Sequence, residues 1–144
     1  MVYIKPYAPA LVWGIFIFAL STWPGKDFPQ LNWGDLLSVD KLVHIAFYAF
    51  LTGLILRGYL LIKKGKLKID GVRFLLQNGQ NKGEMNRFGF YVALGCTAYG
   101  WFLEWFQEHF CQDRLFDPFD GLANTIGAFA VLGLFIWQNR KNVA

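Results

Sequence analysis

Residues 40–62 read DKLVHIAFYAFLTGLILRGYLLI, an apolar run with three ionisable residues at its start. The apolar part, 42–62, and three further runs at 7–23, 88–106 and 119–137 each have about 17 to 21 residues, close to the roughly 20 that span a bilayer as a helix. The 144-residue chain is also 55% hydrophobic and 19% aromatic, a composition typical of membrane proteins. We therefore predict one all-α domain, a polytopic membrane protein folded as a four-transmembrane-helix bundle.

The first run, 7–23, could instead be a cleaved secretory signal ending near Ala19-Leu20-Ser21. Its apolar stretch is longer than the roughly 7 to 15 residues of a signal core and contains bulky side chains, so we expect a retained helix. Lys and Arg orient the bundle, because they accumulate in cytoplasmic segments. Ten of the 14 lie before the first run, in the connection 63–87 or after the last run. This distribution predicts that both termini and the basic loop 63–87 are cytoplasmic.

Polar and ionisable side chains mark the ends of three of the four runs. Each costs a few kcal/mol or more to bury in hydrocarbon unless it finds a partner or water, so such residues are candidates for function. In the predicted orientation, all three ends lie on the outer, extracytoplasmic face. The residues are Asp40, Lys41 and His44; Glu104 and Gln107; and Asp120 and Asn124.

These residues also recur at the spacing of helix faces. Because helical residues three, four or seven apart share a face, each of the three runs is expected to carry a polar stripe, and the stripes are expected to face one another. Ala123 and Gly127 form a small-xxx-small pair that suits close contact between membrane helices. The stripes are Lys41, His44, Tyr48 and Thr52; Glu104, Gln107 and Cys111; and Asp120, Asn124 and Gly127.

Each polar residue also has a simpler interpretation. Asp40 and Asp120 could be helix N-caps with no further role. His44 could be a packing histidine, but its place on one stripe with Lys41 favours a functional role. Glu104 lies inside an otherwise apolar segment, WFLEWF, which indicates a functional site or an essential ion pair.

Three short motifs occur in order along the chain, and they read Asp40-Lys41-x-x-His44-x-x-x-Tyr48, Glu104-x-x-Gln107 and Arg114-x-x-Asp117-x-x-Asp120-x-x-x-Asn124-x-x-Gly127. Together they resemble the VanZ-like family of small bacterial membrane proteins, over about residues 38–135. The family takes its name from a protein that confers resistance to teicoplanin, a lipoglycopeptide antibiotic. The resemblance implies an integral protein of the bacterial plasma membrane. It also implies that the protein could confer teicoplanin-type resistance. The long basic connection 63–87 departs from the family but leaves the motifs intact.

The chemistry of the predicted cluster favours a polar head group as its ligand. Its cations suit phosphate or carboxylate, whereas its carboxylates suit amines and sugar hydroxyls. We therefore expect the cluster to bind the head group of an amphiphile, either a lipid-linked envelope intermediate or a lipoglycopeptide, while the helices hold the tail. The candidate ligand-binding residues are Lys41, His44, Tyr48, Glu104, Gln107, Arg114, Asp117, Asp120 and Asn124.

Two alternatives stay open for the same residues. His44 and Glu104 could be the catalytic acid and base of an intramembrane enzyme that acts on a lipid head group, although no serine or cysteine nucleophile is convincingly placed. Alternatively, the polar groups could form an ion-pair network that only holds the bundle together, in a protein that assists a larger partner.

Membrane lipid and the amphiphile are the expected partners. The chain contains no HExxH motif and no paired CxxC motif, so we predict neither a metal site nor a cofactor. The basic segment 63–68 is expected to touch anionic lipid head groups rather than nucleic acid. Four helices of this length enclose little space, so the sequence leaves an oligomer open.

Overall fold

The computed structural model describes residues 5–23, 33–70, 80–111 and 114–141. Every regular element in these ranges is a helix, which confirms the all-α prediction, and four long helices follow the predicted order. The elements are the 3-10 helix η1 (Lys5–Tyr7) and the α-helices α1 (Ala8–Ser21), α2 (Trp33–Asp70), α3 (Gln80–Phe110) and α4 (Pro118–Lys141).

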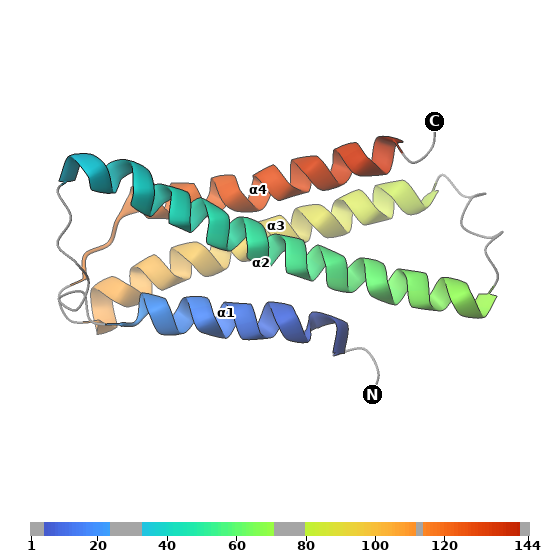
Figure 1. Cartoon of the computed structure of the whole chain (residues 1–144), viewed down its shortest axis with the longest axis horizontal. Helices are drawn as coiled ribbons and strands as arrows, with labels where there is room; N and C mark the ends of the chain where they lie inside the picture. Colours follow the sequence, from blue (N-terminus) through green and yellow to red (C-terminus); the bar gives the residue numbers. More distant parts are fainter. Residues whose placement is uncertain (1–4, 24–32, 71–79, 112–113, 142–144) are drawn as a thin grey trace.

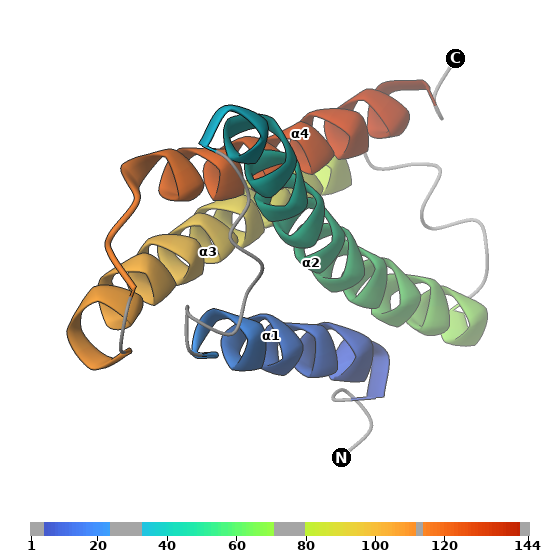
Figure 2. The same cartoon turned by 60° about the vertical axis from the view of Figure 1, so that its left-hand side comes forward.

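The helices run alternately up and down the bundle. The start of α2, the end of α3 and the start of α4 lie at one end, and the opposite ends of these helices lie at the other (Figure 1). α2, α3 and α4 pack against one another, while α1 contacts α2 and α3 on the side away from α4 (Figure 2). The three polar helix ends identified in the sequence are therefore at the same end of the bundle.

Three helices are longer than their apolar runs, and two of these, α2 and α3, extend into the predicted loop. The prediction ended the second helix at residue 62 and placed a loop at 63–87, whereas α2 continues to Asp70 and α3 begins at Gln80. These predicted boundaries were wrong because apolarity marks the part of a helix that avoids water, not all of the part that is helical. Residues 63–70 contain four lysines, which have good helix propensity, and no proline that would end the helix.

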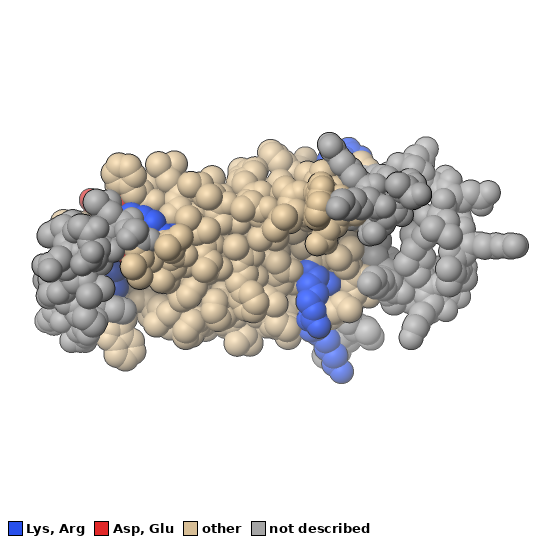
Figure 3. Space-filling view, turned by 45° about the horizontal axis from the view of Figure 1, so that its top comes forward, with Lys and Arg blue, Asp and Glu red and all other residues tan. Residues whose placement is uncertain are grey.

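Two helices contain segments that are long and apolar enough to cross a membrane, Val39–Ile62 in α2 and Pro118–Gln138 in α4. Lys5–Ser21, which includes α1, is a shorter apolar helix. On the face shown in Figure 3, a broad band of surface carries neither basic nor acidic side chains, and charged side chains lie to either side of it. Large apolar side chains such as Ile15 and Ile126 are exposed. These features indicate association with a membrane.

α2 and α4 approach each other closely at Gly127. A Cβ added at this position would collide with the backbone carbonyl of Ile45, so a glycine is required for the two backbones to meet here. The neighbouring small residues Ala123 and Ala128 are buried as well. The contact confirms the small-residue packing predicted for this helix, and it fixes the register in which polar side chains of α2 and α4 face one another.

Candidate functional site

The polar stripe of α2 lies well inside the helix rather than at its start. Because α2 begins at Trp33, Asp40 is about two turns into the helix and does not cap it. The interpretation of Asp40 as only a helix cap was therefore wrong. Its Oδ1 lies 3.8 Å from His44 Nε2, one turn further on, and its Oδ2 lies 3.5 Å from Lys41 Nζ. Asp40 is thus a member of the polar cluster.

Asp117 caps α4 and also contacts α2. Pro118 occupies the first helical position, where its missing N–H leaves no hydrogen bond unmade. Asp117 Oδ1 accepts a hydrogen bond of 2.8 Å from the Phe119 N–H, and Asp117 Oδ2 accepts one of 2.7 Å from Lys41 Nζ. The capping side chain of α4 is therefore Asp117, and the carboxylate of Asp120 is left to contact α2.

Lys41 is at the centre of the polar contact between α2 and α4. Its ammonium donates hydrogen bonds to both Asp117 and Asp120, and it lies 3.5 Å from Asp40. The Lys41 side chain is 17% exposed, compared with 43% for Asp40 and 40% for Asp117. The ammonium is therefore enclosed by carboxylates, two of which reach the surface.

Electrostatics at the α4 cap favour the charged form of Asp117. Burial raises the pKa of this carboxyl, but the hydrogen bonds from Lys41 and from backbone N–H groups, together with the Lys41 charge, lower it further. The net result is that the pKa of Asp117 lies below its usual value. Asp117 is therefore a carboxylate near neutral pH, and it can pair with the ammonium of Lys41.

His44 connects these carboxylates to the amide of Asn124, which is 1% exposed. Its Nδ1 lies 3.0 Å from Asn124 Oδ1, and because an amide oxygen accepts hydrogen bonds, this contact assigns a proton to Nδ1. Nε2 lies 3.6 Å from Asp120 Oδ2 and 3.8 Å from Asp40 Oδ1. Nε2 is thus the ring nitrogen that faces the carboxylates and can contact a ligand.

Glu104 reaches the cluster from α3. It is 3% exposed, and its carboxylate accepts a hydrogen bond from the backbone N–H of Asp117. Lys41, Asp120 and Tyr48 are near enough to interact with its charge. Polar side chains of all three helices thus meet at one end of the bundle, and Glu104 lies deepest among the carboxyl groups.

Gly100 provides the space in which these side chains meet, and the sequence analysis missed it. A Cβ at this position would lie 2.9 Å from the Asn124 side chain and 3.1 Å from Tyr48. The bare backbone of α3 therefore forms one wall of the cluster. The sequence did contain a signal, because Gly100 lies one turn before Glu104 and so on the same helix face.

Two other predicted ligand-binding residues have different surroundings. Gln107 is buried, but its Nε2 donates a hydrogen bond of 2.8 Å to the backbone carbonyl of Ser21 at the end of α1. It thereby satisfies one of the free carbonyls that a helix C-terminus leaves. Arg114 is half-buried in the segment that leads into α4. Gln107 therefore joins α3 to α1, whereas Glu104, one turn earlier, joins α3 to the cluster.

One subset of the cluster has the donor chemistry of a metal site. Single ligand atoms of Asp40, His44 and Asp120 all lie within 4.8 Å of one another, and imidazole with carboxylate is a common ligand set for divalent metals. The ammonium of Lys41 already lies beside both of these carboxylates. A metal ion at this point would meet the repulsion of the neighbouring Lys41 ammonium.

Acceptors dominate the accessible part of the cluster. In the described contacts, Lys41 is bonded to carboxylates of its own chain, and the carboxylates of Asp40 and Asp117 reach the surface. An incoming amine or sugar hydroxyl would find hydrogen-bond acceptors there, whereas a phosphate would meet like charge. The geometry therefore favours ligands that donate hydrogen bonds.

Comparisons of the chain with protein-family models, curated proteins and solved structures found no match. The VanZ-like resemblance therefore depends on the three polar motifs. The role of the cluster has to be inferred from its geometry and chemistry.

Proposed function

We propose that this chain is a VanZ-like protein of the bacterial plasma membrane that binds the head group of an amphiphile at the outer end of its helix bundle. In this proposal, all four helices span the bilayer and both termini are cytoplasmic, as the distribution of Lys and Arg favours. The polar cluster then lies at the extracytoplasmic boundary of the membrane, where a head group can reach it from the lipid.

One observation supports a binding role above all others: the cluster is buried at its base and open at its rim. Glu104 and Asn124 are almost fully buried, whereas Asp40 and Asp117 are partly exposed in the same cluster. Buried polar groups that converge below exposed ones are typical of recognition sites. The exposed rim, formed by Asp40 and Asp117, presents carboxylate oxygens to a ligand. The buried base, formed by Glu104 and Asn124, supports the rim from below.

The acceptor-rich rim narrows the chemistry of the ligand. Amines and sugar hydroxyls donate hydrogen bonds to carboxylates, and charge-assisted bonds of this kind are the stronger ones. A lipid-linked envelope intermediate offers sugar hydroxyls to these carboxylates, while its diphosphate would have to lie away from them. A lipoglycopeptide such as teicoplanin carries both sugars and an amine. Capture of teicoplanin at this site would keep it from its target, and resistance would follow.

The test is direct binding to the purified full chain in lipid nanodiscs, with labelled teicoplanin and a polyprenyl-diphosphate-linked sugar as the two probes. Glu104→Gln and His44→Ala should each weaken binding of the recognised probe by about tenfold or more, which corresponds to about 1.4 kcal/mol. Glu108→Gln is the matched control, because Glu108 lies one turn from Glu104 on α3 with its side chain 47% exposed. Unchanged binding by both site variants would end the proposal.

A structural role is the competing function, and a specific contact favours it. Lys41 is neutralised within the chain by Asp117 and Asp120, so the network itself joins α2 to α4. If the cluster is only structural, Glu104→Gln and His44→Ala will lower the melting temperature, and no probe will bind to wild type.

The binding experiment in nanodiscs also tests the alternative that the cluster is the active site of an intramembrane enzyme. Mass spectrometry of the probe after incubation reports whether its head group has been altered. Product formation by wild type that is abolished in Glu104→Gln would assign acid–base catalysis to the cluster in place of binding alone.

A further inference from the structure

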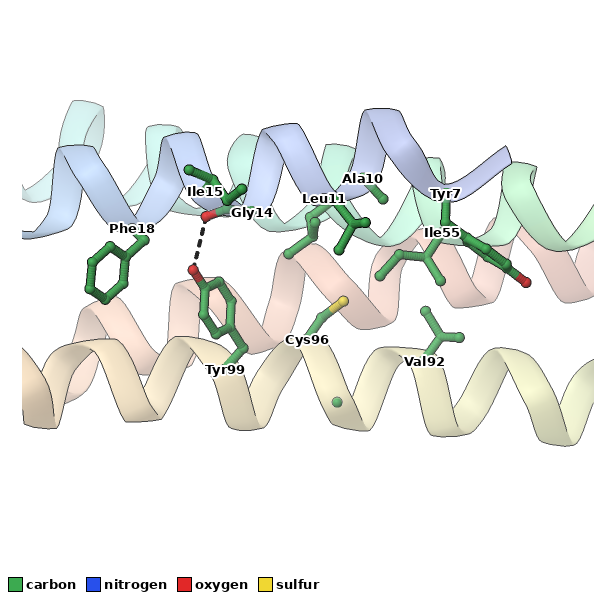
Figure 4. Close-up of a pocket in the computed structure, with 12 residues that line it drawn as sticks. Tyr7, Ala10, Leu11, Gly14, Ile15, Phe18, Ile55, Val92, Cys96 and Tyr99 are labelled. Atoms are coloured by element: carbon green, nitrogen blue, oxygen red, sulfur yellow. Dashed lines mark hydrogen bonds between the residues drawn. The ribbon is translucent and has the colours of Figure 1, made fainter. Parts of the chain in front are cut away.

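An elongated apolar cavity of about 650 Å³ lies between α1 on one side and α2 and α3 on the other (Figure 4). Its wall on the α1 side extends from Tyr7 to Phe18, which is about 16 Å at 1.5 Å per residue. Ile55 contributes to the wall from α2, and Val92 and Gly95 contribute from α3. We refer to this cavity as the α1 groove. It runs parallel to the helices and therefore in the direction of lipid chains.

The α1 groove exists because α1 packs against α2 but stands apart from α3 over part of its length. Ala10 is buried against the bundle, and Trp13 Nε1 donates a hydrogen bond of 3.1 Å to the Phe47 carbonyl of α2. On the α3 side, the Tyr99 hydroxyl donates a hydrogen bond of 2.9 Å to the Gly14 carbonyl (Figure 4). Elsewhere on that side, a Cβ added at Gly95 would meet nothing within 4 Å. The groove therefore lies on the α3 side of α1.

A hydrocarbon chain suits this space better than water or a void does. The groove is open along one side, since Leu11 and Ile15 in its wall are 57% and 68% exposed, and an unfilled apolar groove forfeits dispersion contacts of the atoms in its wall. Ordered water needs two to four polar partners, which a wall of aliphatic and aromatic side chains does not supply. The volume lies within the roughly 300–1,000 Å³ that small-molecule sites occupy.

Two tyrosines lie between the α1 groove and the polar cluster. Tyr99 forms part of the groove wall, its ring centroid lies 6.3 Å from that of the buried Tyr48, and Tyr48 is near enough to Glu104 to interact with its charge. The groove and the cluster therefore lie on either side of these two rings, within the length of one amphiphile.

We propose that the α1 groove binds one hydrocarbon chain, acyl or polyprenyl, of the amphiphile whose head group the polar cluster binds. The inference rests on the proposed function for the identity of the head group, and on the cavity for the chain. It makes the groove a part of the recognition site, and the length and branching of the chain become determinants of specificity.

The test is photo-crosslinking of the full chain in nanodiscs. Two probes carry a diazirine in the hydrocarbon chain, namely phosphatidylglycerol for an acyl chain and a polyprenyl-diphosphate-linked sugar for a polyprenyl chain. Peptide mapping compares Ile55 and Cys96 in the groove, which are half-buried and buried, with Leu134, which is exposed on α4 and reports bulk lipid. The probe whose chain the groove holds should label Ile55 and Cys96 more than Leu134.

Two leucine variants provide a matched pair. Gly95→Leu extends a side chain into the groove, whereas Gly133→Leu adds the same side chain on α4, where the built Cβ also meets nothing within 4 Å. Groove labelling should fall about fivefold or more in Gly95→Leu, because the new side chain takes up space that the ligand needs, and it should be unchanged in Gly133→Leu. Val92→Phe fills the groove from another position, in case Gly95→Leu fails to fold.

The outcomes separate this inference from the proposed function. Equal labelling of groove and bulk-lipid residues, or groove labelling that survives both filling variants, would overturn the chain site. Labelling that falls in Gly95→Leu and also in Glu104→Gln would support both proposals. Labelling that falls in Gly95→Leu but is unaffected by Glu104→Gln would overturn the link to the head group and leave the chain site alone.

Discussion

The two sides of this bundle are built in different ways. Where α4 meets α2, Gly127 lets the two backbones touch, and Lys41 bonds to carboxylates at the start of α4. Where α1 meets α2 and α3, separate contacts such as the hydrogen bond from Tyr99 to Gly14 hold the helix beside a cavity. The chain thus concentrates close packing and ion pairs in one interface and leaves apolar space in the other.

The difference has a physical origin in the lipid environment that we propose. Lipid tails are as apolar as a leucine side chain, so the contact of apolar side chains alone provides little driving force for membrane helices to associate. Small residues and polar contacts therefore decide which helices pack tightly. The α2–α4 interface has both of these, whereas α1 has polar contacts only at isolated points. A tight interface can position polar groups, and a loose one can accept a ligand chain.

The largest expected effect comes from breaking the tight interface. Gly127→Leu would force the new side chain into the Ile45 carbonyl, and we expect a loss of about 3 kcal/mol or more, at the upper end for overpacked sites. Thermal unfolding followed by circular dichroism in detergent measures it. Gly133→Leu on the same helix is the control and should melt near the wild-type temperature. Similar melting of the two variants would contradict the close approach.

The next effect comes from removing the cation between the two helices. Lys41→Met leaves Asp117 and Asp120 facing each other, and we expect a loss of about 2 kcal/mol, less than the roughly 3–5 kcal/mol of a fully buried pair, because Asp117 is partly exposed. The same melting experiment applies. Arg57→Met removes an exposed cation from the same helix and should change little. Equal losses in these two variants would show that Lys41 contributes no specific contact.

A smaller effect, with opposite signs, distinguishes two glycines of α3. Gly100→Ala places a Cβ against Asn124 and Tyr48 and should destabilise by about 1–2 kcal/mol. Gly95→Ala enters the open α1 groove and should stabilise by about 0.5 kcal/mol, because alanine has the better helix propensity. Melting temperatures test both changes. Shifts in the same direction would mean that the groove is not open space.

The smallest effect is a pH dependence at the α4 cap. Because the pKa of Asp117 is lowered in the folded chain, its charge adds stability above the unfolded pKa, and that stability is lost as the pH falls through the folded value. Asp117→Asn keeps a good capping side chain but removes the charge. Wild type should therefore lose more stability than the variant between about pH 5 and about pH 2, by less than about 1 kcal/mol. Parallel melting profiles for the two proteins would argue against this charge contribution.

Part of the candidate site could be predicted, and the reason is local. Lys41 and His44 on one helix, and Asp120 and Asn124 on another, are spaced to share a face, so a pattern of three and four residues was enough to group them. The close packing at Gly127 was predicted for the same reason. The helix boundaries could not be predicted as well, since α2 begins at Trp33 and includes Asp40 as an interior residue rather than a cap.

By itself, the sequence determined the helical class, the order of the helices and the residues that apolar surroundings would not tolerate, because these depend on local periodicity and on the transfer free energy of each side chain. Only the tertiary structure decided that Glu104 joins the cluster while Gln107, one turn away, serves α1. It also decided that Lys41 is neutralised within the chain and that a groove separates α1 from α3. These outcomes depend on how distant segments pack against one another, which no local pattern specifies.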